Sequence, residues 1–111
     1  MRSHKSILFL IVAGAFAQSG YEKDIQKAFE KARKTKKPLW VMVSATWCGP
    51  CKVVEKVVLP NARFQAAVNK DFVPLKIYAA SDEQSTPGAD SLAKRYNVNA
   101  FPTFLFIEPT G

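Results

Sequence analysis

Hydrophobic positions follow two different patterns in the first half of the chain. From position 25 to position 32 they recur at i, i+3, i+4 and i+7, and this spacing predicts an amphipathic helix. Ser19 and Glu22 have capping-box spacing, so we expect Ser19 to be the N-cap of this helix. The next run, Leu39–Ala45, is largely apolar and β-branched without alternation, which is typical of a strand buried on both faces. The apolar helical positions are Ile25, Ala28, Phe29 and Ala32.

Proline and asparagine divide the middle of the chain into shorter elements. Pro50 suits the first turn of a helix, and Pro60 then breaks or kinks that helix. Asn61 can cap a second helical segment. The run Phe72–Ala79 is a second predicted strand, in which Pro74 suggests a local irregularity. Apolar positions at helical spacing on the two helical segments are Val54, Val57 and Val58, followed by Phe64, Ala67 and Val68.

The last third of the chain contains one long polar loop and two further elements. The loop covers Ala80–Asp90 and is followed by a short predicted helix at Ser91–Tyr96. Phe101–Ile107 is a third predicted strand, and Glu108–Gly111 has the composition of a turn. Strands that alternate with helices predict an α/β fold with parallel pairing through right-handed crossovers.

Composition and charge then restrict the class of protein. The chain has 111 residues, of which 48% are hydrophobic and 12% aromatic, enough for one domain with a packed core. The net charge of +7 raises the possibility of a nucleic-acid partner. Much of that charge lies in Lys31–Lys37, at the end of a predicted helix, where the helix dipole favours cations. No aromatic-rich basic surface accompanies it, so no nucleic-acid partner is expected.

The first residues have the organisation of an export signal. Arg2 and Lys5 precede the uncharged, largely apolar run Ile7–Ala17, which ends in the small-x-small pattern Ala15–Ala17. These features predict a signal peptide at residues 1–17, cleaved after Ala17, and a domain at residues 18–111 that is periplasmic or secreted. The run is shorter than the about 20 residues of a membrane span, so no stable membrane anchor is expected after cleavage.

The candidate chemistry lies in the two cysteines, Cys48 and Cys51. A structural zinc site usually has four ligands, and the single histidine, His4, falls in the predicted leader. A metal clip would therefore need a second molecule. A structural disulfide that closes two residues gains little, because stabilisation grows with loop length. A redox pair is favoured, since a cysteine at the start of a helix is stabilised as thiolate.

Two short motifs in the sequence resemble the thioredoxin superfamily. "WCGPCK" at positions 47–52 is similar to its active-site motif, and "FPT" at positions 101–103 is similar to its cis-proline element. Residues 47–77 also resemble exported thioredoxin-like domains, including the C-terminal domain of the bacterial transmembrane disulfide reductase. The resemblance implies a central mixed sheet flanked by helices, apparently lacking the last strand and helix of the family.

The resemblance also implies roles for the two cysteines. Cys48 is the exposed nucleophile that attacks a partner disulfide, and the more buried Cys51 resolves the mixed disulfide. Gly49 and Pro50 shape the turn between them. The redox-active Cys48–Cys51 disulfide would then be the only reactive group, with no metal and no other cofactor.

Further residues would form the substrate-facing wall. Pro102, in a cis peptide bond with Phe101, would present its backbone to an extended substrate and shield the sulfurs. Trp47 would form an apolar lip, or alternatively pack in the core. Thr103 is either part of this wall or an ordinary strand residue.

The sequence departs from the family in two ways. The position of the usual buried acid holds Met42, and no acid lies in Leu39–Thr46. Either a water molecule or a carboxylate from elsewhere would then take the proton from Cys51. Glu55, four residues after Cys51, is the candidate carboxylate, with a solvent-exposed helical glutamate as the alternative. The chain also ends on a turn without a return strand. We therefore expect an exposed edge on the last strand and one incompletely covered face of the sheet.

These features together predict an exported thiol–disulfide oxidoreductase that reduces or isomerises protein disulfides. Gly-Pro between the cysteines is the dipeptide of reducing thioredoxins. A reductant in an oxidising compartment needs a supply of electrons, so a membrane-bound electron donor is an expected partner besides the protein substrates. The alternatives are a disulfide-forming oxidant and a peptide-binding or metal-carrying module without redox turnover.

Overall fold

A computed structural model describes residues 20–80 and 83–110 of the chain. The predicted leader at residues 1–17 and the predicted N-cap Ser19 lie outside these residues. The described elements are α2 (Ile25–Thr35), β1 (Leu39–Ser44), α3 (Gly49–Val53), the π-helix η1 (Val54–Val58), α4 (Ala62–Asp71), β2 (Val73–Tyr78), α5 (Ala89–Arg95) and β3 (Thr103–Ile107).

The three strands form a mixed sheet in the order β2-β1-β3. β1 lies in the centre and every one of its residues is buried, as the unbroken apolar run predicts. It pairs in parallel with β2, where Leu39 lies opposite Val73. It pairs antiparallel with β3, where Leu39 lies opposite Ile107. The predicted mixed, thioredoxin-like sheet is therefore confirmed.

The prediction that all strands run parallel is wrong for β3, because the chain leaves β2 and enters β3 at the same end of the sheet. Tyr78, the last residue of β2, lies opposite Ser44, the last residue of β1. α5, the helix of this connection, has seven residues and spans about 10 Å, about half the length of a six-residue strand. Thr103, the first residue of β3, pairs with Val43 near the end of β1.

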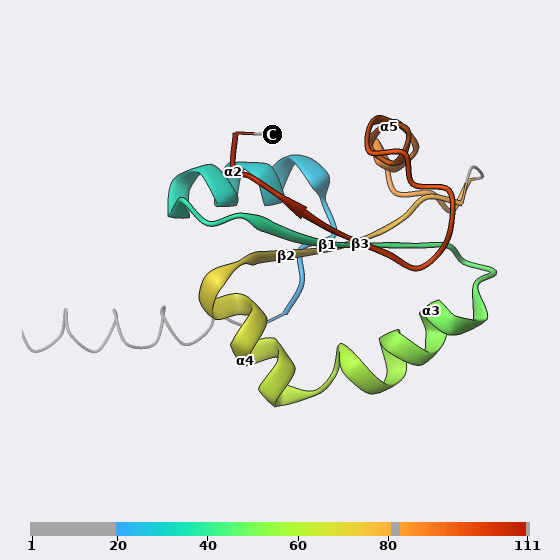
Figure 1. Ribbon diagram of the computed structural model, residues 1–111, viewed down its shortest axis with the longest axis horizontal. Helices are drawn as coiled ribbons and strands as arrows, with labels where there is room; N and C mark the ends of the chain where they lie inside the picture. The colour runs from blue at the N-terminus through green and yellow to red at the C-terminus, as the bar shows by residue number, and fades with distance from the viewer. Residues whose placement is uncertain (1–19, 81–82, 111) are drawn as a thin grey trace, which may run out of the picture.

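Helices cover both faces of the sheet, as Figure 1 shows. α2 and α5 lie on one face, and α3, η1 and α4 lie on the other. The first face has an aliphatic core in which Ala28 and Ala32 of α2 pack beside Val41 and Leu75 of the sheet. The second face has an aromatic and sulfur-rich core, and its fully or nearly buried members are Trp40, Met42, Ala45, Cys48, Cys51, Leu59 and Val68.

The first helix begins later than the capping-box spacing predicts. Asp24 is the N-cap of α2, and its carboxylate accepts a hydrogen bond of 2.9 Å from the Lys27 N–H. Glu22 instead forms a parallel β-bridge with Leu75, beside the outer edge of β2. The backbone of Glu22 is engaged by the sheet edge, and the prediction of a helix start before it is therefore wrong.

Pro74 lies inside β2 without the predicted irregularity. It occupies the register position opposite Trp40, and its carbonyl accepts a hydrogen bond of 2.9 Å from the Glu22 N–H on the outer edge. The N–H and C=O of one strand residue point to the same side, so the N–H that proline lacks would also have faced this edge. The β1–β2 ladder therefore loses no hydrogen bond.

The helix that follows the cysteines changes from α to π geometry after one turn. The Leu59 N–H bonds to the Val54 carbonyl over five residues, at 3.0 Å. Val54 and Val58 are half-buried, but Val57 is 66% exposed, so the prediction that Val57 belongs to the buried side is wrong. In the wider π turn each residue rotates through a smaller angle about the helix axis than in an α turn. The third residue after Val54 therefore remains on the solvent side.

β3 is an edge strand in the described part of the chain, as the sequence predicts. Phe104 and Phe106 point to the same face as Trp40, and they are 42% and 66% exposed. Phe104 and Phe106 each have one aromatic neighbour, Trp40 and Phe72 respectively, with ring centroids 5.5 Å apart in both pairs.

In residues 20–80 and 83–110, no helix combines the length and hydropathy needed to cross a membrane.

The same substitution at a buried valine of β1 and at an exposed valine of η1 tests which of the two belongs to the core. Val41→Ala removes two methylene equivalents from a fully buried position, so we expect it to lower the free energy of unfolding by about 2–3 kcal/mol. Val57→Ala at the exposed position should change it by less than about 0.5 kcal/mol. Urea denaturation measures both values, and equal losses would contradict the assignment of β1 to the core.

Candidate active site

The buried strand β1 delivers the two cysteines to the start of a helix. Four residues after the end of β1, Cys48 occupies the N-cap position of α3. Its Sγ accepts a hydrogen bond of 3.2 Å from the Cys51 N–H, and Pro50 stands in the first turn, where no N–H is needed. A sulfur at this position faces unpaired backbone N–H groups, which stabilise negative charge on it.

Cys48 and Cys51 form a disulfide in this structure, with Cα atoms 5.3 Å apart. Cys48 is 4% exposed and Cys51 is fully buried. The expectation of an exposed Cys48 is therefore wrong for the disulfide form, although Cys48 is the more accessible of the two. Phe101 is one of the residues that pack against the cluster containing both sulfurs.

A second element, between α5 and β3, faces the disulfide. The peptide bond between Phe101 and Pro102 is cis. Trp47 is 66% exposed and meets the Phe101 ring edge-on, with centroids 5.6 Å apart. Trp47 therefore does not pack in the core, where Trp40 lies instead. The structure thus brings the motif and the predicted wall together at one end of the sheet.

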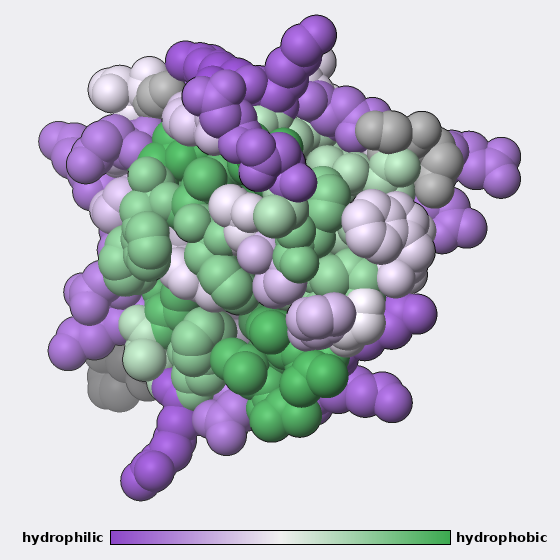
Figure 2. All heavy atoms as spheres, turned by 45° about the vertical axis from the view of Figure 1, so that its right-hand side comes forward, coloured by the Kyte–Doolittle hydropathy of each residue, from purple (hydrophilic) through white to green (hydrophobic). Residues whose placement is uncertain are grey.

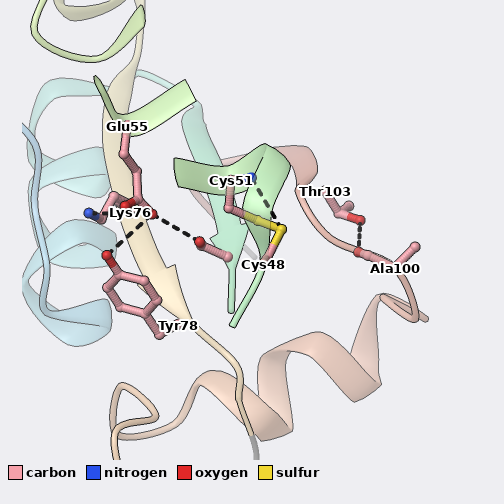
Figure 3. Close-up of a disulfide and its surroundings, with 8 residues drawn as sticks. Cys48, Cys51, Glu55, Lys76, Tyr78, Ala100 and Thr103 are labelled. Carbon is pink, nitrogen blue, oxygen red and sulfur yellow. Dashed lines mark hydrogen bonds and ion pairs between the residues drawn. A yellow bond between two sulfur atoms is a disulfide. The ribbon is translucent and has the colours of Figure 1, made fainter. Parts of the chain in front are cut away.

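Thr103 has a local structural function that the sequence left open. Its hydroxyl donates a hydrogen bond of 2.6 Å to the Ala100 carbonyl, and this bond spans the Phe101–Pro102 pair (Figure 3). Thr103 is also the first residue of β3. It therefore closes the turn that carries the wall.

The core beneath the disulfide is apolar, as the sequence predicts. Met42 is fully buried and belongs to the same cluster as Cys48 and Cys51. No carboxylate from β1 is available here to accept a proton from Cys51. Any such carboxylate has to come from another element.

Glu55 supplies a carboxylate from the helix itself, four residues after Cys51. Its Oε2 accepts hydrogen bonds from the Ser44 hydroxyl at 3.0 Å and the Tyr78 hydroxyl at 3.2 Å. The Lys76 ammonium lies 3.8 Å from the same oxygen, and the Glu55 side chain is 21% exposed. The alternative of a solvent-exposed glutamate is therefore wrong. Figure 3 shows the carboxylate turned toward Tyr78 and Lys76, on the opposite side of the disulfide from Thr103.

Sequence reasoning missed the three partners of Glu55. Ser44 could have indicated a buried polar contact, because it is the one polar residue in the run Leu39–Ala45. A buried hydroxyl needs a hydrogen-bond partner. Tyr78 and Lys76 lie at alternate positions on β2 and reach Glu55 only through the parallel pairing of β1 with β2. No local pattern indicates that contact.

A hollow of about 380 Å³ opens beside this network. It lies at the surface, so the Glu55 network has a side that is open to solvent away from the apolar core. Its lining residues are Ala45, Thr46, Lys52, Glu55, Tyr78 and Gln84.

In the part of the chain that the structure describes, no three or more histidine, cysteine, aspartate or glutamate side chains are arranged to hold a metal ion. The sulfurs of Cys48 and Cys51 are bonded to each other. The metal-carrier alternative therefore gains no additional ligand from this part of the chain.

A buried strand that leads into a Cys-x-x-Cys disulfide at a helix start, opposite a cis-proline loop, defines the thioredoxin-like class of domain. The family model described as thioredoxin-like matches residues 21–109, and the chain belongs to this family. Among curated relatives, thioredoxin H2 of Arabidopsis thaliana is 32% identical over 83 residues, which are 75% of this chain and 54% of that protein. Thiol:disulfide interchange protein DsbD 1 of Pseudomonas aeruginosa is 31% identical over 87 residues, which are 78% of this chain and 14% of that protein.

Solved structures agree with this assignment. A putative disulphide-isomerase from Bacteroides thetaiotaomicron has 35% identity and a TM-score of 0.64, covering 84% of this chain and 75% of that one. DsbH oxidoreductase has a TM-score of 0.70 at 18% identity, covering 86% and 71%, and supports the fold alone. The chain spans about half the length of the Arabidopsis relative and a small part of the Pseudomonas one.

The position of Glu55 leads to a prediction about the step that breaks the mixed disulfide. Cys51 must lose its proton before it attacks Cys48, so Glu55→Gln should slow this step by about tenfold or more. Stopped-flow measurement of the release step between pH 5 and 9 tests this effect. Glu30→Gln on the exposed face of α2 is the matched control. An unchanged rate and an unchanged pH profile in Glu55→Gln would remove Glu55 from the mechanism.

Proposed function

We propose that the chain is a thiol–disulfide oxidoreductase that reduces or isomerises disulfides in other proteins. The observation that carries the proposal is the Cys48–Cys51 disulfide across the first turn of α3, where Cys48 Sγ accepts the Cys51 N–H. This position lowers the free energy of a Cys48 thiolate, the nucleophile in disulfide exchange. The printed names of the relatives, which include thioredoxins and a thiol:disulfide interchange protein, agree with this chemistry.

The reaction proceeds through two exchanges at sulfur. The Cys48 thiolate of the reduced chain attacks one sulfur of the substrate disulfide, forms a mixed disulfide and releases the other substrate sulfur as thiolate. Cys51 then loses its proton and attacks Cys48 Sγ, which releases the second substrate sulfur. Two electrons pass to the substrate, its two thiolates take up two protons, and the Cys48–Cys51 disulfide of this structure results.

The wall and the cysteine turn would position the substrate for this attack. Trp47, Phe101 and Pro102 border the disulfide on one side, and Pro102 offers backbone groups to an extended segment. Gly49 and Pro50 are both exposed beside the sulfurs, so the substrate can approach over them. In this arrangement the substrate meets an apolar border while the polar Glu55 network lies on the other side.

The Gly49-Pro50 dipeptide supports net reduction, and a redox potential tests this direction. Titration against dithiothreitol or glutathione buffers, followed by alkylation of free thiols, should give a value near about −270 mV. A double Cys48→Ser/Cys51→Ser variant is the blank. A value above about −180 mV would contradict the reductase and favour the disulfide-forming oxidant.

We further propose that the chain acts outside the cytosol after removal of residues 1–17. The charged start and the short apolar run of the leader support this assignment. In an oxidising compartment the Cys48–Cys51 disulfide must be reduced again after each turnover. A membrane-bound dithiol reductase is the class of donor that fits this need.

Trapping of partners tests substrate, donor and location together. In Cys51→Ala the mixed disulfide on Cys48 has no resolving thiol, so partners should accumulate as covalent complexes. The variant is expressed with its leader in a host with a periplasm, and the complexes are identified by mass spectrometry. The recovered chain should begin at Gln18. Cys48→Ala/Cys51→Ala is the control, and absence of complexes on Cys48 in Cys51→Ala would contradict the catalytic role.

A further inference from the structure

The helix that carries the cysteines exposes apolar side chains that its own fold does not use. Val53 and Val57 are 60% and 66% exposed. They share a helix with Val54, which packs on the core beneath the disulfide. Exposed valine is unfavourable in a helix relative to lysine or glutamate. Neither packing nor helix propensity therefore explains why valine occupies these two positions.

These side chains continue the surface of the active site. Pro50, Val53 and Val57 are all exposed, and Val53 and Val57 are four residues apart, about one helical turn, so they lie along the solvent side of the helix. We call these three residues the valine stripe. Pro50 stands between the two cysteines, and the stripe therefore begins at the disulfide and leads away from it along η1. Figure 2 shows hydrophobic surface low on this face, over α3 and η1, with hydrophilic side chains projecting around it.

The charges beside the stripe have one sign. Within residues 46–63, all of which the structure describes, the exposed charged side chains are Lys52, Lys56 and Arg63. Glu55 is the only acid in this segment, and its carboxylate is engaged by Ser44, Tyr78 and Lys76. The surface next to the disulfide is therefore apolar with a basic border.

We propose that the valine stripe and its basic border dock the protein partners of the redox reaction. The partner would present apolar side chains flanked by carboxylates next to its reactive disulfide. The proposal rests on the proposed oxidoreductase function and adds the recognition surface to it. A protein partner is favoured over a lipid surface because the stripe is short and starts at the sulfur that must be reached. Complementary charge of this kind raises the association rate and selects partners.

Synthetic disulfide peptides provide the test. Each peptide contains the same internal disulfide, flanked on both sides by leucine alternating with glutamate, by leucine alternating with lysine, or by serine alternating with glutamate. The reduced chain should react with the leucine–glutamate peptide about tenfold faster than with either other peptide. This advantage should shrink when salt rises from about 0.05 M to 0.5 M.

Variants locate the effect on the stripe. Val53→Ser/Val57→Ser and Lys56→Glu should each lower the ratio of the leucine–glutamate rate to the rate with bis(2-hydroxyethyl) disulfide, which is too small to reach Val53 and Val57 while it reacts at Cys48. The expected loss is about fivefold to tenfold. Lys34→Glu makes the same charge change at an exposed position on α2, on the other side of the sheet, and should leave the ratio unchanged. Circular dichroism verifies that the variants are folded.

The outcomes separate this inference from the proposed function. Failure of the wild-type chain to reduce any of the disulfides would overturn the oxidoreductase itself. Reduction of all peptides at equal rates, or unchanged ratios in the stripe variants, would overturn the docking surface alone. Binding to phosphatidylglycerol vesicles, or dimerisation that Val57→Ser abolishes, would assign the stripe to a membrane or to a second copy and would also overturn it.

Discussion

Burial of β1 on both faces is the constraint on which the rest of the structure depends. Every residue from Leu39 to Ser44 is buried, so the strand is fixed by the cores on both sides and by a strand on each edge. The cysteine motif begins three residues after this strand. The position of Cys48 is therefore set by the most rigid part of the domain, which holds the sulfurs in place for in-line exchange.

The same constraint decides where an acid can be placed. A carboxylate at Met42 would lie in a fully buried position, and a charge there is costly without a partner. Here the acid lies on the helix, at Glu55, where it is partly solvated and accepts hydrogen bonds from Ser44 and Tyr78. The buried Ser44 hydroxyl is satisfied by the same contact. The polar network thus reaches the neighbourhood of Cys51 without placing charge in the core.

Sequence patterns predicted the parts of the fold that are decided locally. Leu39–Ala45 identified the central strand, and the Cys48–Cys51 spacing with Pro50 identified the helix start. The features that were missed depend on distant contacts. The antiparallel direction of β3 follows from a connection through α5 that returns to the end of the sheet from which it started, and the partners of Glu55 meet it only because β1 and β2 are neighbours. The exposed position of Val57 follows from a π turn that no residue pattern marks.

The sulfur chemistry of the site has little means of distinguishing one accessible disulfide from another, since each exchange forms and breaks the same type of bond. Selectivity must therefore arise from the surface around the sulfurs, as a difference between affinities for competing partners. On one side the Trp47–Phe101 pair is apolar and uncharged, and on the other the valine stripe carries a basic border. Phe104 and Phe106 are also exposed, but they lie at the edge of the sheet on β3. The valine stripe begins at the cysteines themselves, so contacts with it can position a partner disulfide for attack by Cys48.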